Sequence, residues 1–182
     1  MATIFSHALA ALALGKVYTE ERMPARFWTL AAACAVLPDA DVVTFIFGVR
    51  YGDVLGHRGL SHSLLFALVV GCIAARLAFS GVSVRSTKFL TLAAYFFAAT
   101  ASHAVLDALT NGGLGVAFFS PFDTTRYFFP WRPIKVSPIG LGFFSRYGLV
   151  VLMSEIVWIW LPSIALVLVA WAARKIGKAS SA

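Results

Sequence analysis

Histidine and aspartate residues gather in a few short motifs of this chain. The segments "LPDAD", "GHRGLSHS" and "HAVLD" contain Asp39, Asp41, His57, His62, His103 and Asp107. The fourth histidine, His7, lies near the N-terminus. Imidazole nitrogen and carboxylate oxygen together suit Zn²⁺, Mn²⁺ or Fe²⁺. The residue types therefore predict a divalent metal site, provided that the fold brings these motifs together.

The pair His103 and Asp107 has helical spacing. Residues four apart lie on one face of a helix, one turn from each other. The two side chains could ligate the same metal, or the carboxylate could orient the imidazole. A buried histidine that bonds to a carboxylate one turn away, without any metal, is the alternative. Ionisable residues inside a membrane helix are costly and are commonly functional, which favours the site.

The segment "LPDAD" places two carboxylates close together. Pro38 disfavours helix at Leu37 and predicts a break there. If residues 39–41 are extended, Asp39 and Asp41 point to the same side. Two such carboxylates repel each other unless a cation lies near them. The alternative is a solvated turn with a capping aspartate.

The segment "GHRGLSHS" cannot present both of its histidines on one helical face, because His57 and His62 are five residues apart. Glycines on either side of the first histidine favour a turn, so we place His57 in a loop and His62 in the first turn of the next helix. Ser61 is the predicted N-cap of that helix. Arg58 is a candidate clamp for a phosphate, since a guanidinium binds that group through two donors. A topological or headgroup-binding arginine is the alternative.

Three further observations bear on the site. His7 is either a buried core residue or a ligand. Glu155 is a site carboxylate, a partner for Arg146 or a polar group in helix packing. The two cysteines, Cys34 and Cys72, lack the close spacing of a structural zinc site.

The elements that must position these residues are membrane helices. The chain has 182 residues, of which 60% are hydrophobic and 13% charged, whereas soluble domains carry about 25% charged residues. The net charge of +7 is explained by membrane topology and anionic headgroups, so membrane lipid is the expected partner and nucleic acid is not. We expect a single domain over residues 1–182.

Five apolar segments predict an all-α bundle of about five helices. They are residues 3–16, 27–38, 62–80, 88–109 and 148–173, and the last three are long enough to cross a bilayer. The first is expected to be a retained helix, because its start lacks the basic residues of a secretory signal. Residues 110–147 are rich in Gly, Pro and aromatic side chains and predict an ordered loop near the membrane surface.

The basic residues suggest an orientation in a multi-pass inner-membrane protein. If the five apolar segments alternate in direction across the membrane, nine of the fifteen basic residues fall on one side. They are Lys16, Arg22, Arg26, Arg76, Arg85, Lys88, Arg174, Lys175 and Lys178. If that side is cytoplasmic, all four histidines lie toward the periplasmic face. This orientation depends on the basic residues alone. That all four histidines then lie at the same face is independent support for a site there.

The order of the motifs is familiar. An early helix with His7, followed by "LPDAD", "HRGLSHS" and "HAVLD", resembles the YdjM-like, LexA-regulated family of membrane-bound metal-dependent hydrolases over roughly residues 1–140. The segment "SPFDTTRYFFPWRPIKVSPIG" is similar to the family's loop before the last helix. The resemblance implies an inner-membrane hydrolase that cleaves phosphoester bonds. It also implies metal ligation by matching residues: His7, Asp39, Asp41, His57, His62, His103 and Asp107.

The leading hypothesis is hydrolysis of a phosphoester, or another ester, of a lipid or interfacial substrate by a metal-activated water. Asp39 or Asp41 would bridge metals or act as general base, and Arg58 would stabilise negative charge. Zn²⁺ is the expected metal, with Mn²⁺ or Fe²⁺ as alternatives, and the surplus of donors suggests two ions. The alternative function is a non-enzymatic metal-binding membrane protein or a transporter component, which would need ligands strung through the bilayer.

Overall fold

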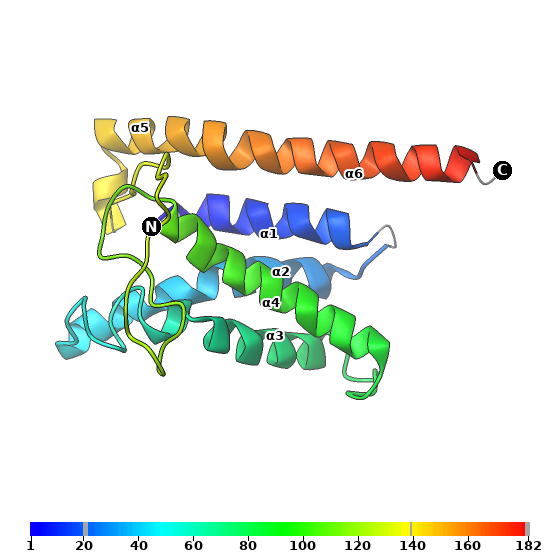
Figure 1. Ribbon diagram of the computed structural model, residues 1–182, viewed down its shortest axis with the longest axis horizontal. Coiled ribbons are helices and arrows are strands. Elements are labelled where there is room, and N and C mark those ends of the chain that lie inside the picture. The colour runs from blue at the N-terminus through cyan, green and yellow to red at the C-terminus, as the bar shows by residue number, and fades with distance from the viewer. Residues whose placement is uncertain (20–21, 139, 181–182) are drawn as a thin grey trace.

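Helices joined by loops make up the protein (Figure 1). The computed structural model describes residues 1–19, 22–138 and 140–180, and within them no strand forms. The α-helices are α1 (Ile4–Tyr18), α2 (Ala25–Val36), α3 (Leu64–Ala78), α4 (Thr87–Ala108), α5 (Arg146–Glu155) and α6 (Leu161–Ser180). The 3₁₀ segments are η1 (Leu37–Phe47), η2 (Leu60–His62) and η3 (Gly140–Phe143), and η4 (Ile156–Trp160) is a π-helical turn.

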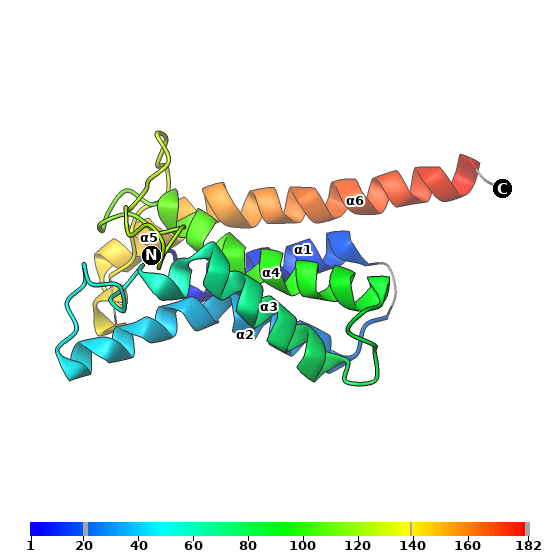
Figure 2. The same cartoon turned by 60° about the horizontal axis from the view of Figure 1, so that its bottom comes forward.

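The predicted bundle of about five helices is confirmed. The segments α5, η4 and α6 run on as one long helix over Arg146–Ala179, which packs beside α1. The other helices lie below this pair in Figure 1, and the turned view of Figure 2 shows α3 crossing α4.

The lengths of the spanning segments differ from the prediction. Helices long and apolar enough to cross a membrane are Ala25–Phe47, Thr87–Ala108 and Arg146–Ala179, whereas α1 and α3 are shorter. The second apolar segment is short by itself, and the flanking residues of η1 extend it directly to Ala25–Phe47. The third was predicted to span, yet α3 has 15 residues, which rise only about 22 Å.

The backbone at "LPDAD" is not extended, so the condition under which Asp39 and Asp41 would point to the same side is not met. Pro38 lies in the first turn of η1, where its missing N–H costs nothing, and the chain continues as 3₁₀ helix. Because a 3₁₀ helix has about three residues per turn, Asp39 and Asp41 project in different directions. Asp39 faces His103 and Asp41 faces His57, while His62 lies between the two carboxylates with one ring nitrogen toward each.

Close packing of α2, α3 and α4 holds the middle of the bundle. Phe27 of α2 stacks on Tyr95 of α4, with ring centroids 4.7 Å apart. Between α3 and α4 the packing depends on Gly71, where a Cβ atom would lie 2.6 Å from the backbone nitrogen of Phe97. Small residues at such crossings let membrane helices approach each other closely.

The long segment between α4 and α5 is ordered in the residues that the structure describes, as predicted. Two isolated bridges pair Thr110 with Ile134 and Val116 with Tyr127. The segment also reaches the beginning of α3, where the Leu64 N–H donates to the Phe118 carbonyl at 2.9 Å. It therefore covers the end of the bundle at which α1 and α3 begin and α4 ends (Figure 1).

Candidate metal centre

All seven predicted donors lie at the covered end of the bundle. α1 carries His7, η1 carries the two aspartates of "LPDAD", and α4 carries the HxxxD pair. None of the seven residues is more than 9% exposed. They are His7, Asp39, Asp41, His57, His62, His103 and Asp107. Residues separated by up to 100 positions in the chain thus form one buried polar network.

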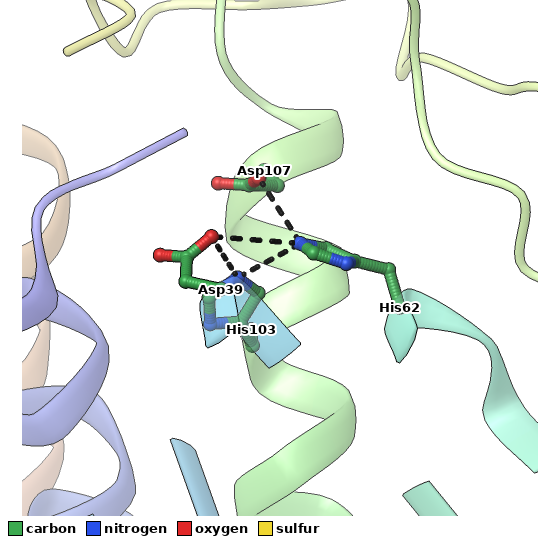
Figure 3. Close-up of side chains that lie close together, drawn as sticks. All are labelled: Asp39, His62, His103 and Asp107. Atoms are coloured by element: carbon green, nitrogen blue, oxygen red, sulfur yellow. Dashed lines mark hydrogen bonds and ion pairs between the residues drawn. The ribbon is translucent and has the colours of Figure 1, made fainter. Parts of the chain in front are cut away.

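Four of these side chains converge most closely (Figure 3). Asp39, His62, His103 and Asp107 each offer one donor atom, and these atoms lie within 4.8 Å of one another. His103 Nε2 is 3.1 Å from His62 Nε2 and 3.3 Å from Asp39 Oδ1. His62 Nε2 is 3.7 Å from Asp39 Oδ1 and from Asp107 Oδ2. We call this set the four-donor cluster.

The other ring nitrogens fix the tautomers of the two histidines in the cluster. His103 Nδ1 lies 2.7 Å from the Ala35 carbonyl oxygen, which can only accept a hydrogen bond. Ser61 Oγ donates to Asp41 at 2.5 Å, so it is left to accept from His62 Nδ1 at 3.0 Å. In each neutral imidazole the proton then resides on Nδ1, and Nε2 carries the lone pair.

The cluster fits a divalent cation. Two lone pairs that face each other at 3.1 Å repel unless a proton or a cation lies between them. Both carboxylate oxygens of Asp39 are buried without a hydrogen bond, although such groups are normally paired. Ligands of a tetrahedral ion with bonds of about 2.0–2.1 Å lie about 3.3 Å from each other. The four distances given above, 3.1–3.7 Å, bracket that value, and every pair of donor atoms lies within 4.8 Å.

Asp41 lies beside the cluster and is occupied by protein groups. Its Oδ1 is 2.7 Å from His57 Nδ1, and its Oδ2 accepts from the Arg58 N–H and the Ser61 hydroxyl. Asp41, His57 and His62 could form a second metal group. The 2.7 Å separation is nevertheless that of a charge-assisted hydrogen bond. This geometry favours an orienting role for Asp41 and His57, so their ligation of a metal stays a prediction.

His7 is the uncommitted imidazole of the site. It stacks on His103 with ring centroids 3.6 Å apart, and its Nε2 is 3.5 Å from Asp107 Oδ1. Both ring nitrogens are buried without a hydrogen bond. The side chain can therefore serve as a further ligand or exchange a proton with a group bound at the cluster.

Arg58 faces into the protein rather than toward an open anion site. Its Nε donates to Asp107 Oδ2 at 2.9 Å, and its Nη atoms donate to the Gly112 carbonyl and the Thr110 hydroxyl. The side chain has no exposed surface, and its backbone adopts a left-handed φ of 64°. The geometry indicates a residue that positions Asp107, and the predicted phosphate clamp gains no support from it.

The loop around Arg58 is held from outside by Arg126. Its guanidinium donates to the carbonyl oxygens of His57, Tyr51 and Asp53. The phenol of Tyr51 packs edge-on against His57, and burial raises its pKa above the ordinary value. Tyr51 is therefore neutral near pH 7 and available as a hydrogen-bond donor.

Glu155 is a structural carboxylate rather than a partner of Arg146. It accepts hydrogen bonds from the Thr3 N–H at 2.6 Å and from the hydroxyls of Thr3 and Ser6 at 2.5 and 2.7 Å. Trp160 also donates to Ser6 at 2.8 Å. These contacts join the long C-terminal helix to the beginning of α1, one turn before His7.

Two groups of the site were not identified from the sequence. Ser61 was expected to cap α3, but Ser63 does so by accepting from the Phe66 N–H at 3.1 Å, which frees Ser61 to orient His62. The carbonyl of Ala35 orients His103 across 68 residues of sequence. Adjacency to a histidine was a usable signal for Ser61, whereas no side-chain pattern marks a backbone carbonyl.

Comparison with known proteins gives a consistent result. No solved structure matches the chain. One similar protein is the inner membrane protein YbcI of Escherichia coli (strain K12), which is 39% identical over 179 residues, or 96% of this chain and 100% of the relative. The family of the YdjM inner membrane protein matches residues 1–177. The chain, with its three candidate membrane spans and its buried His/Asp cluster, therefore belongs to the YdjM inner membrane protein family.

Proposed function

We propose that the protein is a metal-dependent hydrolase of phosphoester bonds in a lipid or other interfacial substrate, with its site on the periplasmic side. One observation carries the proposal. Two imidazoles with fixed tautomers present their Nε2 lone pairs to each other at 3.1 Å, beside the unpaired carboxylate of Asp39. A buried arrangement of this kind calls for a cation, and all its donors lie at one end of the bundle.

The residues divide into holding and orienting roles. His62, His103, Asp39 and Asp107 would hold the cation, and nitrogen with oxygen donors suits Zn²⁺, with Mn²⁺ or Fe²⁺ as alternatives. When bound, a divalent cation supplies Lewis acidity to water and to phosphoryl oxygens. The Ser61 hydroxyl and the Ala35 carbonyl keep the imidazoles in the ligating tautomer, as outer partners commonly do in metal sites.

Proton transfer falls to groups that other contacts leave uncommitted. Neither ring nitrogen of His7 nor either oxygen of Asp39 makes a hydrogen bond, so His7, or the Asp39 oxygen that does not hold the cation, would accept a proton from a water at the cluster. Asp41 is less suited to act as base, because both of its oxygens already accept hydrogen bonds. A second ion is not needed to explain the contacts of Asp41 and His57.

An interfacial substrate is favoured by the surface next to the cluster. The only donors with measurable exposure above 1% are Asp39 and Asp41, at 6% and 9%, and both belong to η1. Farther along η1, Ile46 and Phe47 are 82% and 79% exposed. Exposed apolar residues beside a polar site are typical of a surface that meets lipid. A substrate approaching along η1 would reach these two aspartates before the more deeply buried histidines.

A purely structural metal is the second candidate, and the burial of the cluster favours it. Structural metal sites are closed, whereas catalytic sites keep a position open to water and substrate. Transport is less favoured, because the donors gather at one end instead of following a path through the bilayer.

Turnover by the metal-loaded protein separates these functions. Wild type in lipid nanodiscs would be loaded in turn with Zn²⁺, Mn²⁺ and Fe²⁺ and incubated with bis-p-nitrophenyl phosphate or with phosphatidylglycerol. We expect release of p-nitrophenol or of the headgroup that requires the cation. D39N should abolish that release, and S102A, on the same helix as His103, should not. A protein that binds the cation but cleaves neither probe would favour the structural metal.

A further inference from the structure

Two adjoining pockets lie on the surface formed by α1 and α6, away from the four-donor cluster. A groove of about 510 Å³ runs between α1 and α6. Its walls are apolar side chains of both helices, among them Leu9, Leu12, Ile164 and Leu168, and Trp28 of α2 also lines it. The groove has the size of a site for a small ligand.

A basic pocket of about 430 Å³ continues this groove. The two share Lys16 and Val167, so they form one surface depression. Four cationic residues line the pocket: Lys16, Arg174, Lys175 and Lys178. Among the lining residues that the structure describes, none is acidic. The depression is thus apolar at one end and strongly positive at the other.

Contacts at the basic end hold its shape. Arg174 donates hydrogen bonds to the carbonyls of Lys16 and Val17 in the last turn of α1, which lack partners within their own helix. The Lys16 ammonium lies 4.6 Å from the centroid of the Trp28 ring, and that of Lys175 lies 5.5 Å from the Trp171 ring. The first contact places Lys16, which lines both parts, at their junction, and the second holds Lys175 against the wall of the basic part.

The dimensions of the depression match one leaflet of a bilayer. Ser163 lines the apolar end and lies at the middle of the Arg146–Ala179 helix, and Lys178 lies near its end. Fifteen residues of helix rise about 22 Å. Half of the hydrocarbon core plus one headgroup layer is about 20–22 Å thick. Figures 1 and 2 both show α6 following α1 toward the end opposite the covered one.

We propose that this depression binds one anionic phospholipid, with an acyl chain in the α1–α6 groove and the phosphate between Lys16 and Lys175. An apolar wall alone would accept any lipid tail, but the adjoining cluster of cations selects a negative headgroup. The site is independent of the proposed hydrolysis, because it lies at the other end of the bundle and shares no residue with the four-donor cluster.

Native mass spectrometry tests the proposal on the full chain in detergent. Wild type would be mixed with phosphatidylglycerol or phosphatidylethanolamine carrying the same acyl chains. We expect one retained phosphatidylglycerol per protein and a clear preference over phosphatidylethanolamine. K16Q and K175Q should each weaken retention about fivefold, as expected for one basic residue near an anionic headgroup. I164W, which fills the apolar groove from an exposed position, should weaken it independently of charge.

K88Q is the matched control, since Lys88 is an exposed lysine that lines a different pocket on α4. It should retain the lipid like wild type, and thermal unfolding of each variant checks that the bundle is intact. Equal retention of the two lipids, or equal losses in K16Q and K88Q, would show a nonspecific lipid belt and overturn the proposal. Displacement of the lipid by millimolar inorganic phosphate would identify a free-anion site and overturn it as well.

Discussion

Replacing His103 by alanine is expected to remove the bound metal and any hydrolytic activity together, while the bundle stays folded. His103 Nε2 lies 3.1 Å from His62 Nε2 and 3.3 Å from Asp39 Oδ1, so its loss opens two of the closest contacts in the four-donor cluster. The affinity for Zn²⁺ should fall by more than about a hundredfold, which exceeds the usual effect of an outer partner. Metal titration of the purified variants measures this.

His57 provides the matched control for His103. Both histidines are buried in the same network, but His57 Nδ1 pairs with Asp41, and its ring meets the cluster only edge-on against His62, with ring centroids 5.3 Å apart. H57A should therefore keep the metal with affinity about 10–100-fold lower, as is typical when an orienting partner is lost. Wild-type affinity in H103A would refute the assignment of His103. Complete loss of metal in H57A would instead make His57 a ligand.

Replacing Arg58 by leucine is expected to destabilise the fold by about 3–5 kcal/mol, the usual cost of leaving one partner of a buried ion pair alone. Arg58 Nε is 2.9 Å from Asp107 Oδ2, and both side chains are fully buried. The replacement also removes donors from the Gly112 carbonyl and the Thr110 hydroxyl. The unfolding free energy should be measured after chelation, so that no cation compensates the charge of Asp107.

Arg50 offers a comparison in the same loop. It pairs with Asp53 at 3.2 Å, but its side chain is 86% exposed, and exposed ion pairs contribute about 0–1 kcal/mol. R50L should therefore leave stability nearly unchanged. R58K should lie between R58L and wild type, because an ammonium keeps the charge but cannot reach all three acceptors. If R58L and R50L have the same free energy of unfolding, Arg58 does not hold Asp107 in the manner described.

The sequence was sufficient to predict where the donors meet. Counting apolar segments and basic residues placed all four histidines toward one end, and the structure brings them together there. Helical spacing likewise placed His103 and Asp107 on one face of α4. The first prediction depends on the order of apolar segments and the charges between them, and the second on the periodicity within one helix. Both can be determined without knowing which distant residues are in contact.

The roles of individual donors could not be predicted in the same way. A 3₁₀ helix instead of an extended strand at η1 sends Asp39 toward His103 and Asp41 toward His57. Proline at the start of a helix and proline after its end look alike in sequence, so Pro38 left that choice open. The partners of Arg58 and Glu155 lie about 50 and 150 residues away, and only the packed bundle identifies them.

The central claim is that Asp39, His62, His103 and Asp107 hold a divalent cation. Elemental analysis and X-ray absorption spectroscopy of the purified wild-type protein test it most directly. We predict one tightly bound divalent cation per chain, coordinated by two imidazole nitrogens with oxygen donors and no sulfur. A protein that retains no cation after exposure to Zn²⁺, Mn²⁺ and Fe²⁺, or a spectrum without two imidazole ligands, would contradict the account.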